Sequence, residues 1–271
     1  MKKIKMLTGM LTVLLLFTLC AGCVGREQKK NIEKILAPFE RNNIPELHMQ
    51  QEQDDLSIEL NRAVFVENLV IIDYIMKSPD LKKYDDVFLR FQNEHLSGSG
   101  GGIAVEEKLG EKRMVAYLEL EECSISQEDT GEEVEVIFES FYGADLPELG
   151  SGIKVTFPVK IDKVFTVETV EIGEEFTYKG GTAVVESIDY SRFQTDVHMD
   201  LTKCPDFMTD LCAWEISDDS GKTLHCFGGS DEVYQYSALP EDCKEIGLTL
   251  IQYKREGSYD RLGEMLKIPL R

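Results

Sequence analysis

Strict alternation of apolar and polar residues is the feature that most constrains how this 271-residue chain folds. Apolar residues fill every second position at Leu56, Ile58 and Leu60, and again from Ile153 to Ile161. The same period recurs at Ile72, Tyr74, Met76; at Met114, Ala116, Leu118, Leu120; and at Val134, Val136, Phe138. Successive side chains of a β-strand point to opposite faces, so this period predicts half-buried antiparallel strands. Pro158 places the last of these strands at a sheet edge or a bulge.

The second half of the chain repeats the pattern. We expect strands near residues 165–172, 175–179, 182–190, 195–202, 211–217, 222–227, 246–253 and 264–270. Many short strands at this spacing, without a long helical period, are typical of β-sandwiches. The expected fold is therefore all-β, with two immunoglobulin-like β-sandwich domains in tandem at residues 48–162 and 163–271. Trp214, which shares a strand face with Cys212 and Ile216, is expected to be a core anchor, with a surface binding platform as the alternative.

Three stretches rich in turn residues lie between the expected strands. The glycine run SGSGGG (97–102) lacks the Lys-Ser/Thr and the helix of a phosphate-binding loop, so we interpret it as a flexible loop. QEDTGEE (127–133) is a second turn region, and SDDSGK (217–222) predicts a tight hairpin turn.

The N-terminus has the three regions of an export signal. Residues 1–22 contain three lysines, an apolar stretch from Met6 to Leu19, and small residues before Cys23. The apolar stretch is too short for a membrane span and suits a signal peptide. Ala21-Gly22-Cys23 resembles a bacterial lipoprotein cleavage box, although Cys20 stands where leucine is commoner. This resemblance implies cleavage before Cys23 and lipidation of its thiol; an uncleaved anchor and a Cys20–Cys23 redox motif are the alternatives.

The polar segment at residues 23–47 is expected to be a lipidated tether. Ile32, Ile35, Leu36 and Phe39 recur at helical spacing, interrupted by prolines at 38 and 45. A turn or two of helix is the main expectation, and a helix that docks on a specific partner is the alternative.

Charge excludes several classes of partner. Without residues 1–22, the remaining 26 basic residues face 50 acidic ones, a formal charge of −24. Contacts to phosphate need clustered Lys and Arg, so nucleic acid and anionic lipid headgroups are poor partners. Ordinary hydrophobic content and 24 aromatic residues argue against disorder.

Two segments carry a resemblance to a known family. LSIELNRAVFVENLVIIDYIMKS (56–78) is similar to the opening hairpin of ectodomains in Gram-positive anti-sigma-factor-like membrane proteins. TFPVKIDKVFTVETVEIGEEFTYKGGTAVVESIDYS (156–191) resembles the junction with their C-terminal immunoglobulin-like domain. The resemblance implies tandem β-sandwich ectodomains of unknown ligand. Members that act on sigma factors have a cytosolic segment where this chain has the lipoprotein-like leader, so the anti-sigma function is not carried over.

No motif in the mature chain points to catalysis, to a metal or to a cofactor. The four histidines, His48, His95, His198 and His225, are scattered, and no HExxH, GxSxG or P-loop pattern occurs. The acidic pairs at 54–55, 85–86, 106–107 and 218–219 match no calcium-binding loop, so we interpret them as solvated surface, with a weak Ca²⁺ site as the alternative.

Five cysteines follow Cys23, and two of them are candidates for a disulfide. If Ser217 faces Lys222 across the predicted hairpin turn, Cys212 lies one residue out of register with Cys226, and a bulge would align them. Cys204 and Cys243 would then pair, leaving Cys123 as a thiol; five reduced thiols are the alternative.

The functional expectation is a non-enzymatic lipoprotein, anchored at the extracellular face of the cell membrane. It would bind or sense an envelope protein or a small ligand, without a cofactor. An envelope hydrolase with a site not recognisable from sequence and a purely structural surface spacer are the alternatives.

Overall fold

The computed structural model describes residues 35–121, 123–140, 152–204, 206–209, 212–229, 232–254 and 258–270. In the first half the strands are β1 (Met49–Gln53), β2 (Leu56–Val66), β3 (Leu69–Lys77), β4 (Val87–Gln92), β5 (Ser97–Lys108), β6 (Glu111–Leu120), β7 (Glu133–Ser140), β8 (Lys154–Lys160) and β9 (Val164–Phe165). Two short 3-10 helices, η1 (Leu81–Tyr84) and η2 (Gln127–Asp129), lie between them. The described residues include no helix with the length and apolar character needed to cross a bilayer.

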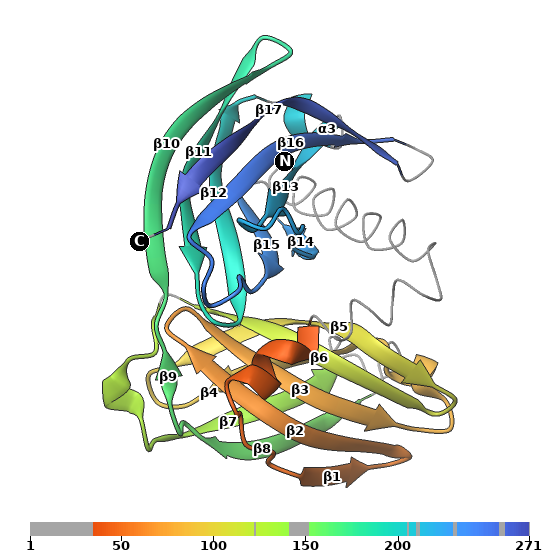
Figure 1. Cartoon of the computed structure of the whole chain (residues 1–271). Helices are drawn as coiled ribbons and strands as arrows, with labels where there is room; N and C mark the ends of the chain where they lie inside the picture. The colour runs from red at the N-terminus through yellow and green to blue at the C-terminus, as the bar shows by residue number, and fades with distance from the viewer. Residues whose placement is uncertain are drawn as a thin grey trace, which may run out of the picture.

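The first half forms one antiparallel sheet that curls into a nearly closed barrel (Figure 1). Eight strands follow the order β1-β2-β3-β6-β5-β4-β7-β8, and β9 adds to β2 in parallel. The two ends of the order meet through Gln53, whose side chain accepts from the Lys154 amide at 2.9 Å and donates to the Gly152 carbonyl at 3.4 Å. The inner faces of the strands fill the barrel with one continuous apolar core that includes Leu60, Phe138 and Phe157.

The prediction of two tandem immunoglobulin-like sandwiches is wrong. The strands of the first half belong to a single curled sheet rather than to two stacked ones. Alternation misled because a barrel and a sandwich both bury one face of every strand, and so they impose the same period of two.

The glycine run at 97–102 is the start of strand β5, so the expectation of a flexible loop there is also wrong. Gly98 and Gly100 face the barrel core, where the backbone of strand β6 and the ring of Phe91 leave no room for a side chain. A Cβ atom at Gly100 would lie 2.0 Å from the carbonyl oxygen of Tyr117, and one at Gly98 would lie 2.4 Å from the Phe91 ring. The glycines permit this close approach of strands.

The second half contains two smaller antiparallel sheets. Its strands are β10 (Glu168–Tyr178), β11 (Gly181–Tyr190), β12 (Gln194–Lys203), β13 (Cys212–Ser217), β14 (Cys226–Gly229), β15 (Val233–Ser237), β16 (Glu245–Tyr253) and β17 (Tyr259–Pro269), with a short helix α3 (Asp206–Thr209). One sheet has the order β10-β11-β12-β15-β14 and the other β13-β16-β17. A shared core joins them, and Trp214 is 2% exposed at its centre, which confirms the expected anchor. Its ring packs against Phe176, and its Nε1 donates to the sulfur of Met199.

A helix over residues 35–41 covers part of the outer surface of the barrel (Figure 1). Ile35 and Phe39 are 4% and 2% exposed, and they pack in a cluster with the outward-facing side chains of β2, β3 and β6. Arg62 of β2 fixes the segment electrostatically, with ion pairs of 2.7 Å to Glu40 and 2.9 Å to Glu46. The helix at 35–41 is therefore packed against the barrel and paired with it.

The same helix helps to join the two halves. Phe193, in the turn between β11 and β12, packs edge-on against Phe39 and against Phe165 of the barrel half, at centroid distances of 6.0 and 4.8 Å. Arg192 donates to Asn42 at 3.1 Å beside this aromatic cluster. The three rings come from the helix, from strand β9 and from the C-terminal half, so together they restrain the orientation of the halves.

Asp196 of β12 is an ionisable group at this joint. Burial raises its pKa from an ordinary value of 3.8 to about 6, opposed by a hydrogen bond from Gln194 and by the nearby His198. The negative charges of Asp189 and Glu119 raise it further, and Glu119 belongs to the barrel strand β6. At neutral pH the ionised Asp196 is therefore unfavourable in the folded protein, partly because Glu119 of the barrel half repels it.

The contribution of Asp196 to stability should be lost as pH rises from about 4 to about 6, because its raised pKa lets the native state bind a proton that the unfolded chain has released. Asp196→Asn should remove this contribution and raise the free energy of unfolding at pH 7.5 by about 1–2 kcal/mol. Urea denaturation at pH 5 and pH 7.5 measures both effects.

Asp200→Asn on the same strand is the control. Hydrogen bonds from Thr202 lower the pKa of Asp200, so this substitution should not stabilise the protein at pH 7.5. An unchanged pH slope in Asp196→Asn would contradict the prediction.

Candidate functional site

Two turns at one end of the barrel bring a histidine and two carboxylates together. Strand β4 pairs with β7 in the register Gln92↔Glu135, so the turn that follows β4 lies beside the residues that precede β7. The first turn carries His95, and the second carries Asp129 and Glu132. Residues 34 or more positions apart in the chain thus become neighbours because β4 is inserted between β5 and β7.

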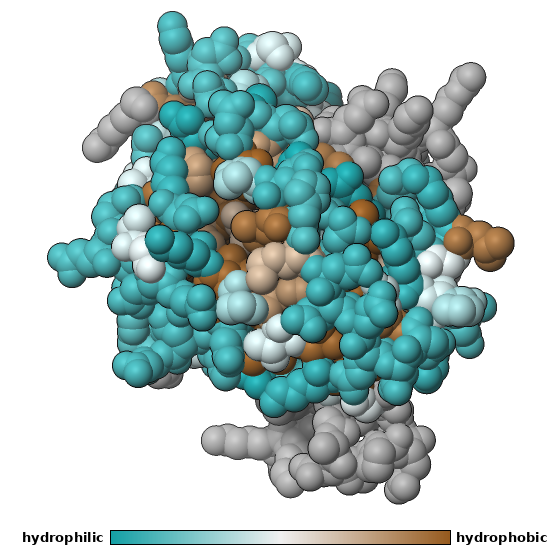
Figure 2. Space-filling model, turned by 90° about the horizontal axis from the view of Figure 1, so that it is seen from below, coloured by the Kyte–Doolittle hydropathy of each residue, from teal (hydrophilic) through white to brown (hydrophobic). Residues whose placement is uncertain are grey.

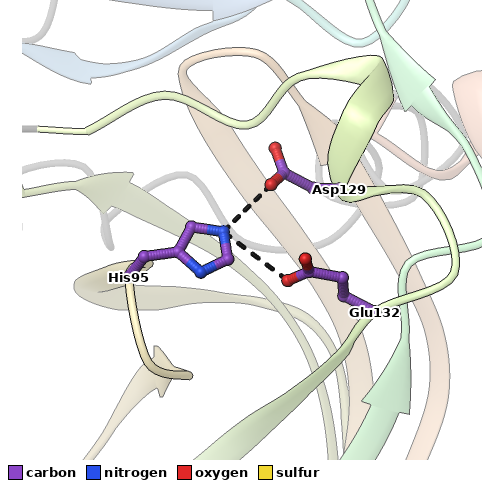
Figure 3. Close-up of side chains that lie close together, drawn as sticks. All are labelled: His95, Asp129 and Glu132. Carbon is purple, nitrogen blue, oxygen red and sulfur yellow. Dashed lines mark hydrogen bonds and ion pairs between the residues drawn. The ribbon is translucent and has the colours of Figure 1, made fainter.

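The imidazole of His95 points one ring nitrogen at both carboxylates (Figure 3). Its Nε2 lies 2.9 Å from Asp129 Oδ1 and 3.5 Å from Glu132 Oε2. The side chain of Asp129 is only 12% exposed, whereas those of His95 and Glu132 are 49% and 43% exposed. The cluster is therefore anchored on a nearly buried aspartate and open to solvent on its other side.

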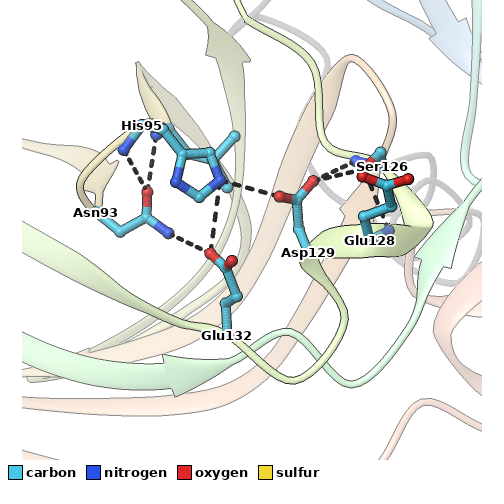
Figure 4. A network of polar contacts seen from close by, with 7 residues as sticks. Asn93, His95, Ser126, Glu128, Asp129 and Glu132 are labelled. Atoms are coloured by element: carbon cyan, nitrogen blue, oxygen red, sulfur yellow. Dashed lines mark hydrogen bonds and ion pairs between the residues drawn. The ribbon is translucent and has the colours of Figure 1, made fainter.

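Neighbouring residues hold the two carboxylates in place (Figure 4). The second oxygen of Asp129 accepts from the backbone amide and the hydroxyl of Ser126, at 2.6 and 3.0 Å, in a capping box of η2. Asn93 donates to Glu132 Oε2 at 3.1 Å, and its own carbonyl oxygen accepts from the amide of His95 at 3.0 Å. All three members of the cluster are thus oriented by contacts outside it.

Charge complementarity in the cluster shifts two pKa values in opposite directions. The hydrogen bond with Asp129 raises the pKa of His95, with a smaller contribution from the charge of Glu132. The backbone amide of Ser126 and then His95 lower the pKa of Asp129. At mildly acidic pH the cluster is an ion pair; when His95 is neutral, its Nε2 and the carboxylate oxygens can all donate electron pairs to a cation.

The residues singled out in the sequence do not converge on this cluster. The leader at 1–22 and Cys23 lie outside the described residues. Cys212 lies in β13 and Cys226 in β14, which belong to different sheets, and the structure has no disulfide between them. The expected register is also different, since Ser217 pairs with Thr223 rather than with Lys222. Cys226 donates its thiol to the Gly228 carbonyl at 3.6 Å.

The acidic pairs are used partly in local hydrogen bonds. Asp55 accepts from Tyr84 and, at 3.0 Å, from Lys83, and these bonds hold its pKa at about 2. The carboxylate of Asp218 accepts hydrogen bonds from Ser220 and from the amide of Lys222, and so it caps the turn after β13.

The described surface has a shallow, open depression beside Asp55, lined by Asp55, Lys77, Ser78, Pro79, Leu109 and Gly110. Seen from the barrel side, hydrophilic side chains cover most of the surface, and hydrophobic ones are visible mainly in its middle (Figure 2).

Comparison with solved structures shows the fold. The chain resembles a conserved domain protein from Bacillus anthracis, with a TM-score of 0.52 and 15% identity over 85% of this chain and 92% of that one. The full ectodomain (Ig1–Ig3) of mouse nectin-like molecule 4 aligns with a TM-score of 0.23 and 10% identity over 80% of this chain and 64% of that one, too little to support an argument. No protein-family model and no curated protein matches the chain. The Bacillus protein shares the all-β fold, and this likeness assigns no function.

Proposed function

We propose that this chain is a non-enzymatic lipoprotein of the cell envelope that binds or senses a protein partner or a small ligand outside the membrane. The leader supports the anchor: three lysines, a short apolar stretch and Ala21-Gly22 precede Cys23. Two acyl chains on that cysteine would hold the protein firmly, whereas a single chain gives only marginal binding.

The position of the helix at 35–41 is the observation that carries this proposal. Only 11 residues separate Cys23 from Ile35, the first described residue of that helix. Fully extended, they span about 40 Å, so the β-structure stays close to the membrane surface. Phe39 packs against Phe193 of the C-terminal half, and Glu40 pairs with Arg62 of the barrel. The helix that follows the proposed anchor therefore contacts both halves.

The surface charge narrows the class of partner. A mature chain with a formal charge of −24 repels polyanions and favours a neutral or basic binding partner. Signalling across the membrane would need a second protein, because the proposed anchor does not itself cross the bilayer.

Cys23→Ala should abolish incorporation of radiolabelled fatty acid and either leave the precursor uncleaved or release the protein from the membrane fraction. The physical reason is the loss of the only thiol that directly follows the small residues of the cleavage box. Cys20→Ala is the matched control and should be labelled as the wild type is. Labelled, membrane-bound Cys23→Ala protein would refute the anchor.

Crosslinking on intact cells tests the binding part of the proposal. The full chain should give a discrete crosslinked species. This species should be absent from a control protein in which residues 1–34 are fused to an unrelated β-domain of similar size. A structural spacer would give the same species with both proteins, and that result would reject a binding function.

A further inference from the structure

We propose that His95, Asp129 and Glu132 form a binding site for a divalent transition-metal ion of the Zn²⁺ class, with water completing the coordination. This site is independent of the proposed membrane anchor. The donor set is one imidazole nitrogen and two carboxylate oxygens, which are ordinary ligands of zinc in proteins.

The spacing of the donor atoms fits such an ion. Zinc bonds to nitrogen and oxygen of about 2.0–2.2 Å in a tetrahedron require donor atoms about 3.3–3.5 Å apart. The measured distances from His95 Nε2 are 2.9 Å to Asp129 Oδ1 and 3.5 Å to Glu132 Oε2, and the three donor atoms all lie within 4.8 Å of one another. Small side-chain adjustments would therefore suffice for an ion to take the place of the histidine proton.

The support of the ligands is the second independent feature. Ser126 occupies one oxygen of Asp129 and leaves Oδ1 directed at His95. Asn93 holds both Glu132, through its side-chain nitrogen, and the backbone of His95, through its oxygen. Metal sites gain affinity from outer hydrogen bonds of this kind because the ligands need not be ordered by the ion itself.

The exposure of the cluster favours an exchangeable ion with an open coordination position. Three protein ligands leave room for at least one water, as in zinc sites that are not purely structural. The half-exposed side chains of His95 and Glu132 give an ion access from solvent, while the nearly buried Asp129 fixes the inner side of the site.

Other histidine pairs in the described residues provide internal controls. His198 lies 3.0 Å from Asp189, and its side chain is 32% exposed, but only one carboxylate reaches it in an ion pair. His48 likewise pairs with Glu46 alone, at 2.9 Å. A histidine with a single carboxylate supplies two ligands instead of three, so these pairs should bind zinc much more weakly.

Titration of the purified protein with Zn²⁺, in the presence of a competing chromophoric chelator, tests the site. Accessible thiols are first alkylated, so that cysteine does not contribute ligands. We expect one ion per chain, and at least about tenfold weaker binding in His95→Gln and in Glu132→Gln. His198→Gln should bind as the wild type does. Co²⁺ should bind at the same site with visible absorption bands of a low-symmetry complex that His95→Gln loses.

Glu132→Gln keeps the result interpretable, because Glu132 is exposed and lies outside the capping box that Asp129 completes. Thermal denaturation shows whether each variant remains folded. The site is rejected if the wild type binds no Zn²⁺, if His95→Gln binds with unchanged affinity, or if His198→Gln loses affinity to the same extent.

Discussion

Gly100→Ala is expected to destabilise the barrel by at least about 3 kcal/mol, because the added methyl group has no space. Its Cβ would lie 2.0 Å from the carbonyl oxygen of Tyr117 and 3.0 Å from the Cα of Leu118, both backbone atoms of β6. A flexible side chain can rotate away from a clash, but a paired strand has to move as a whole. Strand β6 also pairs with β3, so the displacement would spread through the sheet.

Gly101→Ala is the matched control for this prediction. Gly101 is the next residue of the same strand and faces outward, and no atom lies within 4 Å of the place that a Cβ would occupy. Alanine restricts the unfolded chain more than glycine does, so this variant should be neutral or stabilised by up to about 1 kcal/mol. Urea denaturation of both variants separates the outcomes. Equal stability of the two would show that β5 does not pack as described.

This strand also shows where sequence reasoning fails. Alternation predicted the paired strands around Leu56–Leu60 and Met114–Leu120 correctly, because their apolar side chains report which face is buried. Gly98 and Gly100 bury the same face of β5 but have no side chains to report it. A glycine run therefore looks like a loop in the sequence even where it is a strand in close contact with its neighbour.

Closure of the barrel was equally invisible in the sequence. It depends on the insertion of β4 and β5 into the strand order and on the meeting of β1 with β8, where Gln53 bridges to Lys154. Neither leaves a periodic signal. One signal was present: Leu69–Met76 is apolar at almost every position, which indicates a strand covered on both faces. The outer cover is the helix that contains Phe39.

The metal-binding cluster could not be predicted for a related reason. His95 stands alone in its stretch of sequence, and Asp129 and Glu132 lie in a turn that reads as ordinary polar surface. Their proximity follows from the register of β4 with β7, which is a property of the folded sheet. Adjacent acidic residues such as Asp54-Asp55 are the more visible cation-site candidates in a sequence, but the carboxylate of Asp55 accepts hydrogen bonds from Tyr84 and Lys83.

The ion pair between Asp73 and Arg113 carries the second large effect. Asp73 is on the outer face of β3 and is fully buried, at 0% exposure. It accepts two hydrogen bonds from Arg113, of 2.9 Å to Nε and 2.6 Å to Nη2, and they raise the pKa of the guanidinium. This two-pronged geometry is the strongest form of the arginine–carboxylate pair.

Asp73→Asn should destabilise the protein by about 3 kcal/mol, since a partly buried arginine loses its counter-charge while the surrounding packing stays intact. Asp260→Asn, which breaks the exposed pair with Lys254 at 2.7 Å, is the control and should cost less than about 1 kcal/mol. The double variant Asp73→Leu/Arg113→Leu distinguishes charge from packing. Replacing both partners removes the unpaired charge, so the double variant should be more stable than Asp73→Asn.

Urea denaturation of the wild type and these three variants measures the differences in the free energy of unfolding. A loss below about 0.5 kcal/mol in Asp73→Asn would show that Arg113 finds an equal partner elsewhere, and Glu106, which faces it across β5 and β6, is the acid placed to be one.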